Sequence, residues 1–212
     1  MSDTELVQGT DQWLKARCGS LGASRMSDAI AKTKTGWGAS RANLMAELLV
    51  ERFTGLPAEK FTNDAMRWGI EYEPEARAAY EAAKNYEVLQ IGIVKHPLIA
   101  WTHASPDGLV GDHGLVEIKC PTSATHIDTL LGKSVPGKYI TQIQWQLACT
   151  GRGWCDFVSY DPRMPENMRL FVKRITRDAD RCAELADLAT DFLAELDDKL
   201  ARLTSLYERE AA

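Results

Sequence analysis

The chain has 212 residues, of which 45% are hydrophobic, 26% charged and 8% aromatic. These proportions are typical of soluble globular proteins and exclude disordered, collagen-like and coiled-coil classes. The length suits one domain, and we expect residues 1–212 to form it without an internal linker. No run of about 18 apolar residues occurs, and the N-terminus lacks a signal-peptide pattern, so we expect no membrane span and no secretion. Five cysteines without a CxxC pair favour a reducing cytoplasm.

The net charge of −5 is distributed unevenly along the chain. Residues 178–212 contain ten acidic and four basic residues, whereas the rest of the chain has 21 basic and 20 acidic residues. Between residues 15 and 41, six basic residues stand against one acidic residue. This segment could contact phosphates, although an ordinary solvated surface has the same composition.

The N-terminal half is predicted to be helical. Short helices are expected over residues 11–17 and 22–31, the second capped by Ser24, and the sequence TKTGWG after them is expected to be a loop. Longer helices are predicted over residues 42–53 and 64–84, with a kink or restart near Glu73 because Pro74 follows it.

The middle of the chain changes to short β-rich segments. Strands are predicted at 88–94, 98–103, 107–110, 115–119, 155–161 and 170–176, and a helix at 139–150. A final amphipathic helix, with an acidic outer face, is expected over about 180–210. The predicted fold is therefore α/β (α+β), with a central mixed β-sheet flanked by helices.

The most informative stretch is SPDGLVGDHGLVEIKCP, residues 105–121. Alternation along a strand places Glu117 and Lys119 on one face, and the turn GDHG folds that strand back toward Asp107. Two carboxylates without histidine or cysteine form a hard-oxygen site suited to Mg²⁺ or Mn²⁺. Lys119 could orient the attacking water or neutralise charge that develops on the phosphorane. A surface hairpin with an ion pair remains the alternative.

The spacing of Asp, nine intervening residues and Glu-x-Lys resembles the signature of the PD-(D/E)xK nucleases, whose fold is a restriction-endonuclease-like core. Further blocks make the resemblance more specific, and together they are similar to the bacteriophage lambda exonuclease family of viral recombination nucleases. These blocks are RCGSLGASR (17–25), WGIEYEPEAR (68–77), ASPDGL (104–109), EIKCP (117–121), YITQIQ (139–144) and YDPRM (160–164).

The resemblance implies roles for particular residues. Asp107, Glu117 and the main-chain carbonyl of Ile118 match ligands of two Mg²⁺ ions, for which Mn²⁺ could substitute, and Glu73 matches a helical glutamate that completes the metal site. Lys119 matches the catalytic lysine, and Gln142 a glutamine near the scissile bond, although Gln144 and Gln146 lie close by in the sequence. The pocket for the terminal 5′-phosphate is matched by Arg17, Ser24 and Ser105. We also expect DNA contacts from Trp37, Lys32 and Lys34.

The family resemblance implies a processive 5′ to 3′ exonuclease that degrades one strand of linear duplex DNA to give 3′ tails for single-strand annealing. It further implies a homotrimeric ring, a single-strand annealing protein as partner, and a phage or prophage origin in a bacterial cell. Two alternatives remain open. One is an endonuclease of the same superfamily that cuts internally, and the other is a DNA-end-binding protein without catalysis.

Overall fold

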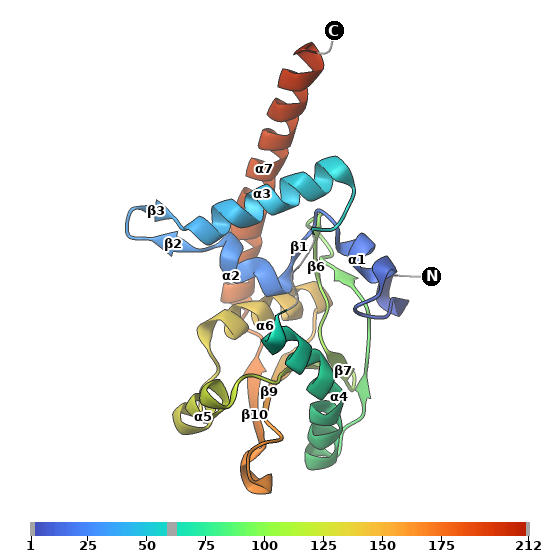
Figure 1. The fold of residues 1–212 in the computed structure, drawn as a ribbon, viewed down its shortest axis with the longest axis vertical. Helices are drawn as coiled ribbons and strands as arrows, with labels where there is room; N and C mark the ends of the chain where they lie inside the picture. The colour runs from blue at the N-terminus through green and yellow to red at the C-terminus, as the bar shows by residue number, and fades with distance from the viewer. Residues whose placement is uncertain (1–2, 59–62, 211–212) are drawn as a thin grey trace.

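A computed structural model describes residues 3–58 and 63–210 (Figure 1). Its main sheet has five strands in the order β10-β9-β8-β7-β4. The β8–β9 pair is parallel and the other pairs are antiparallel, so the sheet is mixed as predicted. The strands are β4 (Val88–Leu89), β7 (Gly108–Val110), β8 (Gly114–Lys119), β9 (Trp154–Tyr160) and β10 (Leu170–Thr176).

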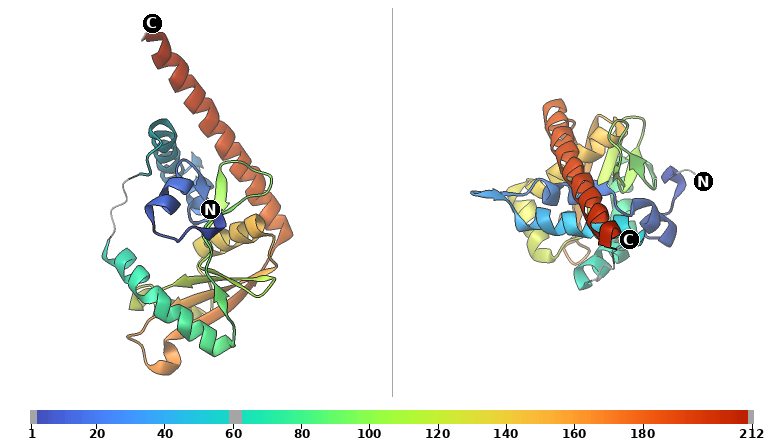
Figure 2. Two further views of the ribbon diagram at one scale, coloured as in Figure 1. Left: turned by 90° about the vertical axis from the view of Figure 1, so that its right-hand side faces the viewer. Right: turned by 90° about the horizontal axis from the view of Figure 1, so that it is seen from above.

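Helices cover both faces of this sheet (Figure 2). On one face α4 (Asp64–Lys84) packs Ala76 and Tyr80 against Val116 and Val158. On the other face α6 (Gly137–Thr150) packs Ile143 and Leu147 against strand residues such as Phe157, and α5 (Ser123–Gly132) lies beside β9. Strand β8 is therefore buried on both faces, and the site residues it holds are not on an open surface.

A second layer is built mainly from the N-terminal segments. Its three-stranded sheet has the order β1-β6-β5, with β1 (Leu21–Gly22), β5 (Val94–Lys95) and β6 (Thr102–Ala104). Its helices are α1 (Asp11–Arg17), α2 (Met26–Ala29) and α3 (Ala39–Thr54), with the 3₁₀ turns η1 (Asp3–Glu5) and η2 (Ala23–Arg25). A third 3₁₀ turn, η3 (Glu166–Met168), lies between β9 and β10. One hydrophobic core joins α2, α3, α6 and α7 (Ala179–Glu210).

Helix α7 confirms the predicted C-terminal amphipathic helix. The part of the helix up to Leu196 buries Leu185, Phe192 and Leu196 in the core, while its last turns project beyond the body (Figure 1). Leu206 and Tyr207, on the projecting part, are exposed. No helix within residues 3–58 and 63–210 is long and apolar enough to cross a membrane.

The N-terminal predictions were partly wrong. Residues 22–31 do not form one helix capped by Ser24: β1 ends at Gly22, η2 follows, and α2 has only four residues with no side-chain cap. Gly22 pairs with His103 of β6, and this tertiary pairing overrides the local helical pattern. The TKTGWG segment belongs to a hairpin of β2 (Lys32–Thr33) and β3 (Gly36–Trp37), which extends sideways from the body (Figure 1).

Other boundaries also differ from the predictions. The segment 88–94 splits into β4 and β5, which join different sheets, and α5 was not predicted at all. Helix α4 runs without interruption through Pro74, so there is no restart at Glu73. The predicted helices 11–17, 42–53, 64–84 and 139–150 are confirmed, the last ending at Gly151 in the left-handed conformation (φ 69°).

Candidate active site

The β7–β8 hairpin brings Asp107 beside the strand that contains Glu117. Gly108 pairs with Val116 and Val110 with Gly114, so the register lies one residue from the predicted Val110–Leu115 pair. In this register the Oδ2 atom of Asp107 accepts a hydrogen bond from the backbone N–H of Ile118 at 2.6 Å. The other oxygen, Oδ1, accepts no hydrogen bond from the residues that the structure describes. It is left for water or a cation.

Glu117 is held by two glutamines of α6. Its side chain is 1% exposed, and Oε1 accepts from Gln142 Nε2 at 2.7 Å while Oε2 accepts from Gln146 Nε2 at 2.6 Å. The two glutamines are four residues apart and share one helix face. Gln144 points elsewhere and donates to the carbonyl of Thr176 at 2.9 Å. The sequence indicated a glutamine near the site, but it did not show that two would bind the same carboxylate.

Lys119 lies at the end of β8, next to Glu117. Its ammonium forms an ion pair with Oε1 of Glu117 and lies 5.3 Å from the centre of the Tyr139 ring. Burial alone would lower the pKa of Lys119, but the carboxylates of Glu117 and Asp107 outweigh burial and raise it. Burial and the charge of Glu117 raise the pKa of Asp107 well above its ordinary value. The structure therefore brings Asp107, Glu117 and Lys119 into one electrostatically linked cluster.

Glu73 stands at the edge of this cluster on α4. Its carboxylate forms an ion pair with Arg77 on the next turn. Burial raises the pKa of Glu73, and Arg77 and Lys119 only partly offset that rise. Within the described part of the chain, no three histidine, cysteine, aspartate or glutamate side chains are grouped so that they could hold a metal ion.

The donor chemistry of the cluster nevertheless fits a hard cation. Asp107, Glu117 and the Ile118 carbonyl offer only oxygen atoms, the ligands that Mg²⁺ and Mn²⁺ prefer. Burial, and to a smaller extent the charge of Glu117, raise the pKa of both Asp107 and Glu73, because carboxylates close together repel one another. A divalent cation would relieve this repulsion. Glu73 could join the ligands after it leaves Arg77.

Arg17, which was predicted to bind the terminal phosphate, is held by two residues that were not predicted. Its Nε atom donates to Nε2 of His103 at 3.0 Å, and its guanidinium lies 4.0 Å from the centre of the Trp13 ring. Burial lowers the pKa of Arg17 to about 10, although Glu51 opposes the shift. His103, which is 2% exposed, was assigned no chemistry from the sequence, where it is one of four scattered histidines.

Ser24 and Ser105, the other two residues predicted for the phosphate pocket, are not hydrogen-bonded to Arg17 in the structure. Ser24 is exposed in η2, and no hydrogen bond joins it to Arg17. The buried hydroxyl of Ser105 has no hydrogen-bond partner among the described residues, although Ser105 follows His103 by two positions. The expected DNA contacts Trp37, Lys32 and Lys34 are all on the β2–β3 hairpin or its turn, where Trp37 is 47% exposed.

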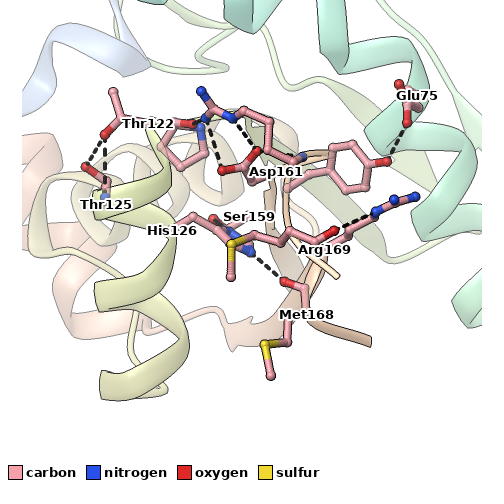
Figure 3. Close-up of polar contacts among 12 residues, drawn as sticks. Glu75, Thr122, Thr125, His126, Ser159, Asp161, Met168 and Arg169 are labelled. Atoms are coloured by element: carbon pink, nitrogen blue, oxygen red, sulfur yellow. Dashed lines mark hydrogen bonds and ion pairs between the residues drawn. The ribbon is translucent and has the colours of Figure 1, made fainter. Parts of the chain in front are cut away.

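A buried polar cluster lies beside the end of β9 and the loop that follows it, which together contain the YDPRM sequence (Figure 3). His126 of α5 bonds Ser159 Oγ at 2.7 Å through Nδ1 and the carbonyl of Met168 at 2.8 Å through Nε2. Because a carbonyl only accepts, Nε2 carries a proton and donates to Met168. Ser159 pairs in register with Lys119, so the cluster fixes the strand beside this lysine.

The comparisons agree with this geometry. A mixed sheet between helices, with Asp107 just before the first strand of a hairpin and Glu117 and Lys119 on the second, defines the class of PD-(D/E)xK nucleases. More particularly, the chain belongs to the family of YqaJ-like viral recombinase domains, whose model matches residues 12–153. The match includes Arg17 and the whole Asp107–Lys119 hairpin.

Two solved structures show the same fold. The crystal structure of an alkaline exonuclease (LHK-Exo) from Laribacter hongkongensis is 46% identical, covers 94% of this chain and 99% of its own, and has a TM-score of 0.89. A phage-related exonuclease from Haemophilus somnus is 15% identical, covers 85% of this chain and 96% of its own, and has a TM-score of 0.64, which shows the fold alone.

A curated relative comes from a giant virus. The uncharacterized protein R354 of Acanthamoeba polyphaga mimivirus is 27% identical over 208 residues. The match covers 92% of this chain and 36% of the relative, so this chain spans just over a third of that protein's length.

Proposed function

We propose that this protein is a divalent-metal-dependent exonuclease that degrades one strand of linear duplex DNA from its 5′ end. It would release 5′-mononucleotides and leave 3′ tails for single-strand annealing. The observation that carries the proposal is the cluster of Asp107, Glu117 and Lys119 on one hairpin. The similarity to LHK-Exo supports it, and that enzyme has also been crystallised in complex with dAMP, a nucleoside monophosphate.

Each side chain of the cluster has a definite task in this proposal. The site would hold two Mg²⁺ ions through Asp107, Glu117 and the Ile118 carbonyl, with Glu73 as a further ligand. Mn²⁺ could replace both Mg²⁺ ions. The metal supplies Lewis-acid polarisation of the scissile phosphate. Gln142 and Gln146 fix the carboxylate of Glu117 in one orientation. Lys119 orients the attacking water and neutralises charge on the phosphorane.

Substrate binding and assembly complete the proposal. Arg17, with Ser24 and Ser105, binds the terminal 5′-phosphate, and the β2–β3 hairpin contacts the duplex through Trp37 and its lysines. The protein works as a homotrimeric ring beside a single-strand annealing protein in the cytoplasm of a bacterial cell. These tasks follow from the family resemblance and from the half-buried position of Arg17.

Product analysis tests the proposed reaction. Linear duplex is incubated with Mg²⁺, with Mn²⁺ or with EDTA, and the products are identified by mass spectrometry, with Lys119→Met as the inactive control. We expect 5′-mononucleotides with either metal, none in EDTA, and none from the variant. Oligonucleotide products, or cleavage of covalently closed circles, would favour an endonuclease. End binding without any product would favour a non-catalytic protein.

A further inference from the structure

His103 has a defined protonation state in the structure. An arginine Nε–H can only donate, so His103 Nε2, at 3.0 Å from it, must be the unprotonated ring nitrogen. The ring proton is then on Nδ1, which donates to Ser20 Oγ at 2.9 Å. His103 is therefore a neutral imidazole in a single tautomer, held between α1 and the residues that lead into β1.

Several neighbours fix the position of the Arg17 guanidinium. Trp13 lies against one face at 4.0 Å, and His103 binds the Nε edge. The backbone of Gly22 is close to both groups, because a Cβ atom there would lie 3.3 Å from an Arg17 terminal nitrogen and 3.1 Å from His103 Nε2. A larger residue at position 22 would therefore push the pair apart.

Arg17 differs from the other arginines of this layer in forming no ion pair with a carboxylate among residues 3–58 and 63–210. Arg25 binds Glu47, Arg41 binds Glu195 and Arg52 binds Asp197. In the described part of the chain, no acceptor binds either terminal nitrogen of Arg17. The carboxylate oxygens of Glu51, whose charge acts on Arg17, accept from the backbone N–H groups of Gly19 and Ala58 instead.

We propose that His103 is a positioning residue of the terminal-phosphate site: its neutral imidazole orients Arg17 through Nε and leaves the guanidinium charge and its two terminal nitrogens for an anion. This inference rests on the proposed role of Arg17. A carboxylate at position 103 would also orient Arg17, but it would neutralise the charge and compete with phosphate. An uncharged acceptor is thus the group that both fixes the arginine and keeps its affinity for phosphate.

The inference is tested by the preference for 5′-phosphorylated over 5′-hydroxyl duplex ends, measured as a ratio of kcat/KM values. In His103→Gln the side-chain carbonyl can take the place of Nε2, so the preference should remain close to that of the parent. His103→Leu should reduce the preference on the order of tenfold, because Arg17 loses its acceptor, and the loss should fall on KM more than on kcat. Thermal unfolding verifies that both variants are folded.

Arg17→Ala, measured in the same assay, separates this inference from the function on which it rests. If Arg17→Ala loses the preference while His103→Leu keeps it, the positioning role is refuted and the phosphate role of Arg17 stands. An equal loss in His103→Gln and His103→Leu also refutes positioning through the acceptor. If Arg17→Ala keeps the parental preference, the phosphate site lies elsewhere and both proposals fail.

Discussion

The carboxylate of Glu117 lies where water hardly reaches it, so its hydrogen bonds and ion pair come from three side-chain partners. Both of its oxygens are bound by these partners, which are Gln142, Gln146 and Lys119. A buried carboxylate that loses one donor either changes its orientation or bears the cost of desolvation. The two glutamines therefore determine where the Glu117 oxygens point, and in the proposed mechanism this orientation matters for catalysis.

Gln146→Leu tests this view of the site. The variant removes the donor to Oε2 at similar volume, and we expect turnover to fall roughly 10- to 100-fold, as is usual when a residue that orients a metal ligand is lost. Gln144→Leu is the matched control, because Gln144 lies on the same helix but binds Thr176. Nucleotide release per folded molecule is the measurement. Equal losses in the two variants would contradict a specific role for Gln146.

Sequence reasoning located these residues only in part. The spacing of Asp107, Glu117 and Lys119 follows from strand alternation and a short turn, and both can be read from local sequence. The partners of Glu117 and Arg17 depend instead on where α6 and β6 pack, and no local pattern encodes that packing. His103 illustrates the limit, because its partner Arg17 is 86 residues away in the chain.

A buried aspartate is one of the polar groups that tie helix α4 to the sheet. Asp156 of β9 is 1% exposed and accepts from the Tyr80 hydroxyl at 2.9 Å and from Arg174 Nε and Nη2 at 2.9 Å each. The arrangement joins α4, β9 and β10. It also helps to hold the helix that presents Glu73 to the site.

We expect Tyr80→Phe to reduce the free energy of unfolding by about 1–2 kcal/mol, because Asp156 loses a donor while the ring remains packed. Tyr86→Phe is the control, because the Tyr86 hydroxyl forms only a long hydrogen bond of 3.4 Å with an Arg174 nitrogen and its side chain is more exposed. Urea unfolding of both variants gives the comparison. Equal stability of Tyr80→Phe and the parent would show that Arg174 alone satisfies Asp156.

The β2–β3 hairpin differs from its prediction in a way that bears on DNA binding. A loop was expected there, whereas the structure presents Trp37 on a short hairpin, with its ring 4.2 Å from the Arg41 guanidinium. A base that stacks on an aromatic side chain gains about 1–3 kcal/mol. Trp37→Ala should therefore weaken DNA binding several-fold or more in fluorescence anisotropy.

Trp101→Ala provides the matched control for the hairpin. Trp101 is also exposed and also stacks with an arginine, Arg52, but it lies outside the hairpin, just before β6. We expect this variant to bind DNA like the parent. Equal weakening by both substitutions would mean that loss of any exposed tryptophan, and not the hairpin contact, lowers the affinity.

The elements that could be predicted are those with strong internal periodicity. Helices α3, α6 and α7 and strands β9 and β10 were located within a few residues, because each buries one regular stripe or a continuous apolar run. The segments that were missed, β1 and α5, and the helix predicted over 22–31, of which only η2 and α2 form, are short or take their conformation from distant partners. Gly22 forms a strand only because His103 lies beside it.

At the scale of the whole molecule, charge and assembly are linked. An acidic protein of 23.6 kDa would bind duplex DNA weakly by itself, because phosphate contacts are sensitive to salt. A closed ring would instead keep the DNA in place topologically. We expect a homotrimer of about three times the monomer mass by light scattering, and long digestion tracts in the presence of competitor DNA. A stable monomer that remains processive would refute the ring as the cause.

The central claim is digestion from the 5′ end by the Asp107–Glu117–Lys119 cluster, and a labelled duplex tests it most directly. One linear duplex carries different fluorophores near the 5′ and 3′ ends of the same strand, and the opposite strand is blocked at its 5′ end. With Mg²⁺ the 5′ label should be released first, the 3′ label last, and neither by Lys119→Met. Earlier release of the 3′ label, or undiminished release by the variant, would contradict the account.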